Sequence, residues 1–316
     1  MGGSCRRGTR CAALAALVLA LAASAGAARG AERGLDYFAL GDSVASGRGL
    51  MDPGGPCRRS PLAYPEQARD LLAQRYASVR FRFFACAGAE AIAPERTGFG
   101  ALSRQVDAAL RRLTHRPTLV SVTIGINDSD WSDITLTYSR LRNPDEGSFE
   151  QWAGGVAAGV ERAVVEQLRR LLAHPNVRVV VTEYFNPVNR GSLLFGPPIP
   201  CPDVEACYRR TELVIDELNT ALRRVPGELK ARRRVAVAPV RDAFRGHESP
   251  SPECGDAPPE VAETWIQYPT DPASNSLPPL PPTVPGPWRG DCFHPNELGA
   301  AAIASAVEQA ARRIGR

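Results

Sequence analysis

The sequence lacks the patterns that mark most metal and nucleotide sites. Its 316 residues include only four histidines, and it has neither a CxxC pair nor an HExxH segment, so the usual spacings of a zinc site are missing. No GxxxxGKS, GxxxxGKT or GxGxxG pattern follows a predicted strand, which argues against a phosphate loop or a dinucleotide site. We therefore expect an activity that needs no metal and no cofactor.

Long apolar runs are also scarce, and the longest lies near the start. Three arginines precede an apolar stretch at 12–23, and small residues follow it through Ala28. This order is typical of a secretory signal peptide, and the stretch is short and alanine-rich for a membrane span. We expect residues 1–28 to be cleaved from a secreted domain at 29–316 that has no stable membrane span. An uncleaved membrane anchor is the alternative.

Charge of one sign does not dominate the exported part. Three of the 38 Lys and Arg residues lie in the leader, which leaves 35 basic against 34 acidic side chains. Nucleic acids and anionic surfaces attract proteins through clustered positive charge, so this balance argues against both as the main partner. We expect a monomer that takes a small-molecule or lipid substrate and binds no nucleic acid.

Six of the eight cysteines remain once the leader is removed. An even number of cysteines in an exported chain indicates disulfide bonds, here three of them. The six residues are Cys57, Cys86, Cys201, Cys207, Cys254 and Cys292.

Short runs of β-branched and aromatic residues alternate with longer amphipathic stretches. This alternation is typical of βαβ units that build a parallel sheet. The predicted strands are 36–40, 79–85, 118–124, 177–184 and 234–240. The predicted helices are 65–75, 102–113, 156–173, 205–224 and 296–312. Five strands with flanking helices predict one doubly wound α/β domain.

Two irregular insertions, near 186–203 and 244–290, interrupt this alternation and are rich in proline or glycine. Loops this long inside a compact domain are usually functional or fixed by cross-links, and both contain cysteine at or near their ends. Some of their apolar residues are candidates for an acyl-chain groove, although burial against the sheet explains them almost as well. These residues are Leu193, Leu194, Phe195, Trp265, Ile266 and Trp288.

The segments at the carboxyl ends of the predicted strands carry the candidate catalytic residues. Ligands of open parallel sheets bind beyond these strand ends. Ser43 follows the first strand, Gly88 the second and Asn127 the third, while His294 precedes the last helix. We expect Ser43 and His294 to meet across the same edge of the sheet.

These residue types suit acyl transfer. The Ser43 hydroxyl is a poor nucleophile without a base, and His294 can take its proton and return it to the leaving alcohol. Asp291, three residues before His294, can hold the imidazole in the required orientation. The backbone N–H groups of Ser43 and Gly88 and the side-chain amide of Asn127 are suitable donors for an oxyanion hole.

Each motif also has an ordinary structural explanation. Gly-Asp-Ser commonly forms turns and helix caps, so we assign Asp42 a turn-stabilising role, and Asp128 a similar local one. Three of the four histidines lie after helical stretches or in an insertion without a motif. Position 45 is Ala45, so the Gly-x-Ser-x-Gly elbow of α/β-hydrolases is absent. Catalysis is favoured because four motifs occur together, each in its place relative to a strand or the last helix.

The motifs together resemble the SGNH, or GDSL-type, hydrolase family, whose name lists the Ser, Gly, Asn and His found here as Ser43, Gly88, Asn127 and His294. The likeness is closest to exported actinobacterial lipases and esterases. One departure is Ile126, where many relatives have a second glycine, and this affects how Asn127 is placed. The cues for that branch are Gly41-Asp42-Ser43, Cys57-Arg58-Arg59-Ser60, Tyr64-Pro65, the segment from Cys86 to Gly88, and His294-Pro295-Asn296.

The resemblance implies a flavodoxin-like three-layer α/β/α sandwich with a parallel five-stranded sheet. It implies a secreted serine ester hydrolase, a lipase or esterase that cleaves carboxylic acyl esters through an acyl-serine intermediate. The alternatives are a carbohydrate O-acetyl esterase with the same catalytic residues and a non-catalytic exported binding protein on the same fold. The implied disulfides pair in sequence order, Cys57 with Cys86, Cys201 with Cys207, and Cys254 with Cys292.

Overall fold

A computed structural model describes most of the part of the chain that carries the predicted elements. The described residues are 34–51, 55–92, 101–129, 145–187, 203–247, 266 and 294–314. The predicted signal peptide, most of both insertions, Asp291 and three of the six cysteines lie outside them.

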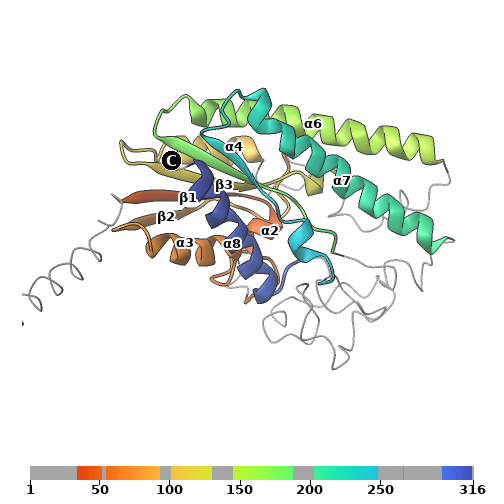
Figure 1. Cartoon of the computed structure of the whole chain (residues 1–316), viewed down its shortest axis with the longest axis horizontal. Helices are drawn as coiled ribbons and strands as arrows, with labels where there is room; N and C mark the ends of the chain where they lie inside the picture. The colour runs from red at the N-terminus through yellow and green to blue at the C-terminus, as the bar shows by residue number, and fades with distance from the viewer. Residues whose placement is uncertain are drawn as a thin grey trace, which may run out of the picture.

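The described chain forms one five-stranded parallel sheet, which confirms the predicted strands (Figure 1). The strands lie in the order β2-β1-β3-β4-β5, and every neighbouring pair is parallel. Every residue of β1 and β3 is buried, whereas the edge strand β2 alternates between partly buried and exposed residues. Apolar runs in the central strands therefore form the core. The bounds are β1 Leu35–Gly41, β2 Val79–Phe83, β3 Thr118–Thr123, β4 Val177–Thr182 and β5 Val235–Ala238.

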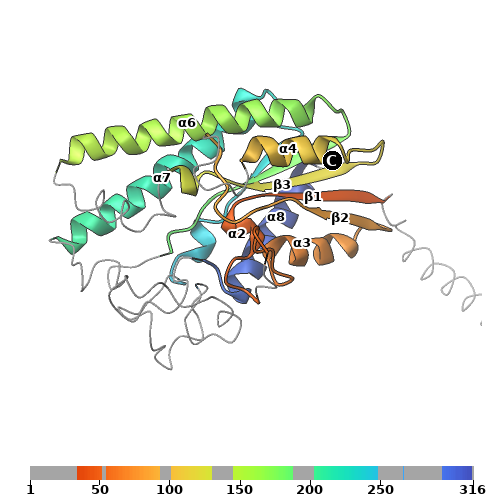
Figure 2. The same ribbon diagram turned by 180° about the vertical axis from the view of Figure 1, so that it is seen from behind.

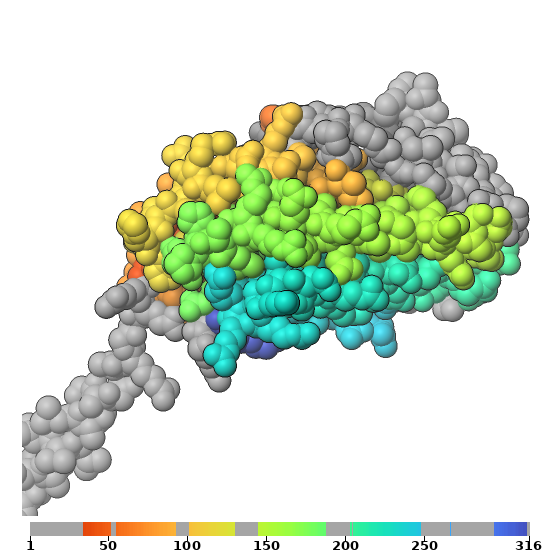
Figure 3. Space-filling model, turned by 90° about the horizontal axis from the view of Figure 1, so that it is seen from above, coloured from red at the N-terminus to blue at the C-terminus, as the bar shows by residue number. Residues whose placement is uncertain are grey.

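Helices cover both faces of the sheet and complete the predicted three-layer α/β/α sandwich. Helices α4, α6 and α7 pack on one face, and α3 and α8 pack on the other (Figures 1 and 2). Seen from above in Figure 3, α6 and α7 run side by side. The bounds are α3 Tyr64–Ala73, α4 Leu102–Leu110, α6 Glu146–Leu172, α7 Val204–Glu228 and α8 Glu297–Ile314.

Helix α6 begins at Glu146 and not at the expected position 156. The Asp145 side chain caps its first turn by accepting a hydrogen bond from Ser148 N at 3.1 Å. Arg210 of α7 holds the same turn, because its guanidinium donates to both carboxylate oxygens of Glu146 and lies over the Phe149 ring. These tertiary contacts offset the low helix propensity of the Gly-Gly pair at 154–155.

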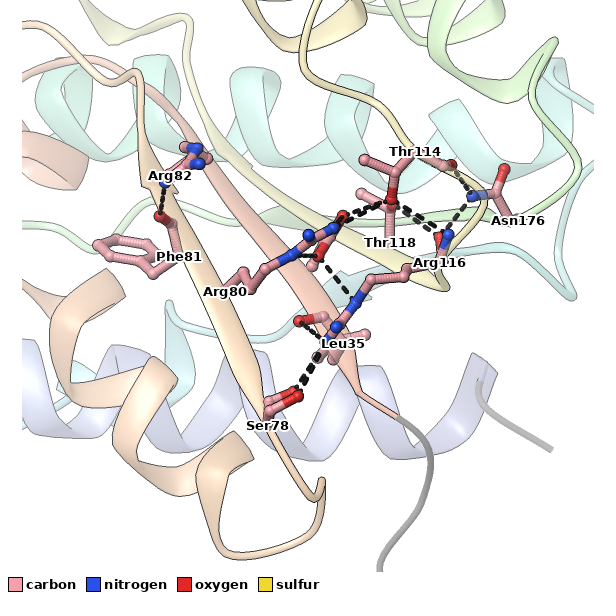
Figure 4. A network of polar contacts seen from close by, with 10 residues as sticks. Leu35, Ser78, Arg80, Phe81, Arg82, Thr114, Arg116, Thr118 and Asn176 are labelled. Atoms are coloured by element: carbon pink, nitrogen blue, oxygen red, sulfur yellow. Dashed lines mark hydrogen bonds and ion pairs between the residues drawn. The ribbon is translucent and has the colours of Figure 1, made fainter.

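The amino end of the sheet is fastened by an ion-pair network around Asp36, which is 2% exposed. Figure 4 shows Arg80, Thr114 and Arg116 of this network gathered at the start of β1. Arg80 donates to both carboxylate oxygens at 2.7 Å, and Thr114 Oγ1 donates at 2.8 Å. Arg116 Nε lies 3.2 Å from Oδ1. Burial alone raises the pKa of Asp36, but the hydrogen bonds from Arg80 and Thr114 and the nearby positive charges outweigh it and lower the pKa below its usual value.

We expect Asp36→Asn to lower the free energy of unfolding at pH 7 by about 1 to 3 kcal/mol, the cost of leaving buried hydrogen-bonding groups without a suitable partner. Because the folded-state pKa of Asp36 is lowered, its contribution is present above the unfolded-state pKa and is lost as the pH falls through the folded-state value. The difference between wild type and variant should therefore shrink as the pH is lowered from 7 toward 3. Urea unfolding at several pH values measures it.

Asp242→Asn provides the control, because Asp242 forms an ion pair with Arg245 in which both side chains are largely exposed. Exposed pairs contribute little, so this variant should change the free energy of unfolding by less than about 1 kcal/mol. A loss for Asp36→Asn that stays constant with pH would contradict the assignment.

Candidate active site

Ser43 lies at a sharp turn directly after β1, at the start of the short helix α2 (Ser43–Ser46). Gly41 has a φ of +140°, and a Cβ at this position would lie 2.2 Å from the carbonyl oxygen of Thr123. Glycine is therefore required here by the backbone conformation and by the close approach of β3. Asp42 caps the helix by accepting a hydrogen bond from Val44 N at 2.9 Å, which confirms its predicted role in the turn.

His294 meets Ser43 across the carboxyl edge of the sheet, as the sequence predicts. Its Nε2 lies 2.6 Å from Ser43 Oγ, although the two residues are 251 positions apart. Asn296 accepts a hydrogen bond from Gly299 N at 3.0 Å and so fixes the start of α8 directly after the histidine. The Nδ1 atom of His294 is buried. Asp291, the residue predicted to orient the ring, lies outside the described residues.

The segment with Gly88 is bonded to the Ser43 turn and to the loop that follows it. Cys86 N donates to the Gly41 carbonyl at 2.9 Å, and Ala87 N donates to the Cys57 carbonyl at 3.1 Å. Cys57 and Cys86 form a disulfide, the pairing that the resemblance implies. Gly88 has a φ of +80°, a conformation that favours glycine.

The two other implied disulfides are described only in part. Cys207 is disulfide-bonded, and its expected partner Cys201 lies outside the described residues. Cys254 and Cys292 both lie outside them.

Asn127 joins the loop after β3 to the Gly88 segment. It lies in the 3-10 helix η1 (Ile126–Ser129), is 4% exposed and donates through Nδ2 to the Ala89 carbonyl at 2.9 Å. An amide nitrogen carries two hydrogens, so a second donor remains on the same atom. Ile126, which stands where many relatives have glycine, forms the first residue of η1 and still allows this contact.

Asp128 holds the far part of the Gly88 segment. Its two carboxylate oxygens accept from Ala91 N at 2.9 Å and from Ile92 N at 2.8 Å, in keeping with the local role predicted for it. Burial raises the pKa of Asp128 to about 6, the charge of Glu90 adds to the rise, and the two backbone N–H groups oppose it.

The structure also brings in three buried polar residues that the sequence did not single out. The Gln105 side chain accepts from Gly41 N at 2.7 Å and donates to the Gly41 carbonyl at 2.8 Å. The Tyr184 hydroxyl donates to Asp42, and Asn219 binds the backbone of Tyr184. A polar residue on the apolar face of a helix was the available signal for both amides, since Gln105 lies three residues after the buried Leu102 and Asn219 three residues before the buried Leu222.

Of the residues proposed for an acyl-chain groove, Ile266 is the one within the described part of the chain. It is fully buried, forms an antiparallel bridge with Pro295, and its carbonyl accepts from Asn296 Nδ2 at 3.5 Å. Ile266 therefore packs beneath the segment that carries His294.

The described ranges contain neither a membrane-spanning helix nor a metal-binding cluster of side chains. No helix within them has both the length and the apolar character needed to cross a membrane. These ranges also contain no group of three or more His, Cys, Asp or Glu side chains that could hold a metal ion.

Solved structures from two Streptomyces species share this fold. An extracellular lipase from Streptomyces rimosus superposes with a TM-score of 0.55 at 23% identity, covering 87% of this chain and 99% of the lipase. Phospholipase A1 from Streptomyces albidoflavus NA297 gives a TM-score of 0.53 at 20% identity, covering 87% of this chain and 98% of the phospholipase. At these identities the likeness establishes the fold. None of the curated proteins compared with the chain matches it.

The family match includes both residues of the Ser43–His294 pair. The model of the GDSL-like lipase/acylhydrolase family matches residues 39–302, from the end of β1 into α8. This range includes the loops after β1, β2 and β3 and the segment before α8. The chain therefore belongs to the GDSL-like lipase/acylhydrolase family, whose members are ester hydrolases.

Proposed function

We propose that this protein is an exported lipase or esterase in which Ser43 is the nucleophile and His294 is the general base. The observation that carries the proposal is the 2.6 Å contact between Ser43 Oγ and His294 Nε2. Such a contact allows the imidazole to remove the hydroxyl proton as the oxygen attacks an ester carbonyl.

The reaction proceeds through an acyl-enzyme. Ser43 Oγ bonds to the carbonyl carbon while its proton moves to His294 Nε2, and the imidazolium then returns that proton to the departing alcohol. A water molecule enters, loses a proton to His294 and attacks the acyl carbon. The acid leaves, and Ser43 recovers its proton.

The negative charge on the carbonyl oxygen is stabilised by three donors from three loops. Ser43 begins α2, so its backbone N–H has no acceptor within that helix. The Gly88 N–H and the second hydrogen on Asn127 Nδ2 are the other two. The bond from Asn127 to the Ala89 carbonyl fixes the Asn127 amide relative to the segment that carries Gly88.

Asp291 completes the proposed machinery as the residue that orients His294. It would accept a hydrogen bond from Nδ1, which selects the tautomer that leaves Nε2 able to accept the serine proton. The carboxylate of Asp42 does not take this role, because its oxygens bind Val44 N and the Tyr184 hydroxyl.

The proposed substrates are acyl esters of lipids, and the proposed location is outside the cell. Two neighbours on the same fold, described as an extracellular lipase and a phospholipase A1, support this choice. The leader at 1–28 and the Cys57–Cys86 disulfide support export, because disulfides persist in oxidising compartments. We propose residues 29–316 as the exported hydrolase domain.

Hydrolysis of p-nitrophenyl esters of graded chain length tests the proposal. We expect turnover by wild type on long-chain as well as short-chain esters, and no turnover by Ser43→Ala, whose unfolding temperature should stay close to that of wild type. Activity confined to acetyl and butyryl esters would support a carbohydrate O-acetyl esterase instead. A folded wild-type protein that fails to react with a fluorophosphonate probe would indicate a binding protein.

Asn127→Ala should lower kcat by about 100-fold to 1,000-fold, the usual effect of losing one oxyanion donor, while KM changes little. Asn176→Ala is the matched control, since Asn176 also donates from a side-chain amide to a loop carbonyl, that of Thr114 at 2.8 Å, but at the amino end of the sheet. Steady-state kinetics on one ester separate the two variants. Equal losses of kcat would show that Asn127 acts only through stability.

Reduction of the Cys57–Cys86 disulfide should lower activity before the sheet unfolds, because this bond fixes the segment that carries Gly88. Ester hydrolysis and the near-UV circular dichroism signal are followed together while the reductant concentration is raised. The double variant Cys57→Ser/Cys86→Ser isolates this bond from the others. If ester hydrolysis and the near-UV circular dichroism signal are lost together, the disulfide does not act locally on the segment that carries Gly88.

A further inference from the structure

A series of buried hydrogen bonds connects α7 to the nucleophile. Asn219 is fully buried, and its side-chain amide accepts from Tyr184 N at 2.7 Å and donates to the Tyr184 carbonyl at 2.8 Å. The Tyr184 hydroxyl donates to Asp42 Oδ2. Asp42 Oδ1 accepts from the N–H of Val44, the residue after Ser43. The end of β4 is thus tied to the helix turn that carries the nucleophile.

The partner of Asp42 is unusual for this chain. Asp42 is 0% exposed, and a buried carboxylate without partners would take up a proton rather than remain charged. Arginine is the abundant cation of this sequence, yet the donor to Asp42 is a neutral phenol. A phenol stabilises the anion by a hydrogen bond and leaves its negative charge uncompensated.

The surroundings of Asp42 include a group that becomes a cation during the proposed reaction. The side chains with the largest effects on the pKa of Asp42 are Tyr184 and His294, and the charge of Asp42 in turn raises the pKa of Tyr64. The Tyr64 hydroxyl is bonded to Thr123 Oγ1 at 2.8 Å, and of these three side chains His294 is the one that becomes a cation in the proposed reaction. The negative charge therefore acts on His294 when it carries the proton taken from Ser43.

We infer that Tyr184 is a positioning residue for ester hydrolysis: its hydroxyl keeps Asp42 charged, so that Asp42 both fixes the turn that carries Ser43 and attracts the protonated form of His294. The inference rests on the proposed function, since it takes Ser43 and His294 as nucleophile and base. Tyr184 is 2% exposed and its hydroxyl is engaged by Asp42, so it acts through Asp42 and not on the substrate.

The arrangement has a direct consequence in mild acid. Burial raises the pKa of Asp42 to about 6, and the hydrogen bond from Tyr184 is the foremost of the interactions that hold it down. Protonation of Asp42 removes the negative charge and weakens its hold on Val44 N. Removal of the Tyr184 hydroxyl raises the pKa of Asp42 further, so the fall in activity on acidification begins at a higher pH.

The test compares Tyr184→Phe with Tyr37→Phe over pH 4.5 to 8.5 on one p-nitrophenyl ester. Tyr37 is also fully buried, but its hydroxyl is bonded to a neutral group, Ser121 Oγ, at 2.9 Å. We expect Tyr184→Phe to lower kcat about tenfold at pH 7 with KM unchanged, and to move the acid limb of kcat/KM up by about one pH unit, as expected for the loss of one hydrogen bond to a charged group. Tyr37→Phe should keep the wild-type kcat and acid limb.

Asp42→Asn provides a second route to the same conclusion. It removes the ionisation itself, so adding Tyr184→Phe to this variant should leave the acid limb where Asp42→Asn alone places it. A Tyr184→Phe variant with a wild-type profile would overturn the role of Tyr184, as would a shift that persists in the Asp42→Asn background. The role of Tyr184 would also be overturned if Asp42→Asn left the acid limb of kcat/KM at its wild-type position.

Labelling of Ser43 by a fluorophosphonate keeps this test separate from that of the proposed function. Wild-type protein that is not labelled refutes the serine nucleophile and the ester hydrolase itself. The other outcome begins with wild-type protein that is labelled. If Tyr184→Phe is then labelled at the same rate and with the same pH dependence as Tyr37→Phe, only the positioning role of Tyr184 is refuted.

Discussion

The hydrogen bond between Ser43 and His294 is the contact on which the rest of the site depends. The two residues are 251 positions apart in the sequence, so the bond exists only because β1 ends and α8 begins at the same edge of one sheet. Parallel topology provides that edge, since every strand delivers its loop to the same side. The other loops there are fastened to each other as well as to their strands, through Cys86 N to Gly41 and Asn127 to Ala89.

The loops around Ser43 are held by two kinds of buried group. Gln105 and Asn219 are neutral amides, and each binds the N–H and the carbonyl of one loop residue at once. Asp42 and Asp128 are carboxylates, and their burial disfavours the charged form. In both, hydrogen bonds from backbone N–H groups oppose this effect of burial. Such groups hold a backbone in place before any substrate arrives, which is the condition for effective stabilisation of charge in a transition state.

The sheet and the four family residues could be predicted because their signals are local. A short apolar run followed by glycine or a polar turn marks the end of a buried strand, and Ser43 and Asn127 each follow such a run. The start of α6 was placed too late, since the stabilising contacts of Glu146 come from Arg210, far along the chain. The sequence identifies Tyr184 only as the end of a predicted strand, because nothing near it in sequence indicates that its hydroxyl reaches Asp42, 142 residues away.

The separation of Ser43 from His294 in the sequence also determines when, during synthesis, the proposed catalytic pair can form. Ser43 and the first three strands emerge early in synthesis, while His294, the proposed base, follows 251 residues after Ser43. A partly synthesised chain therefore carries Ser43 without its proposed base. On this proposal, the enzyme becomes active only once α8 has packed on the sheet and brought His294 to Ser43.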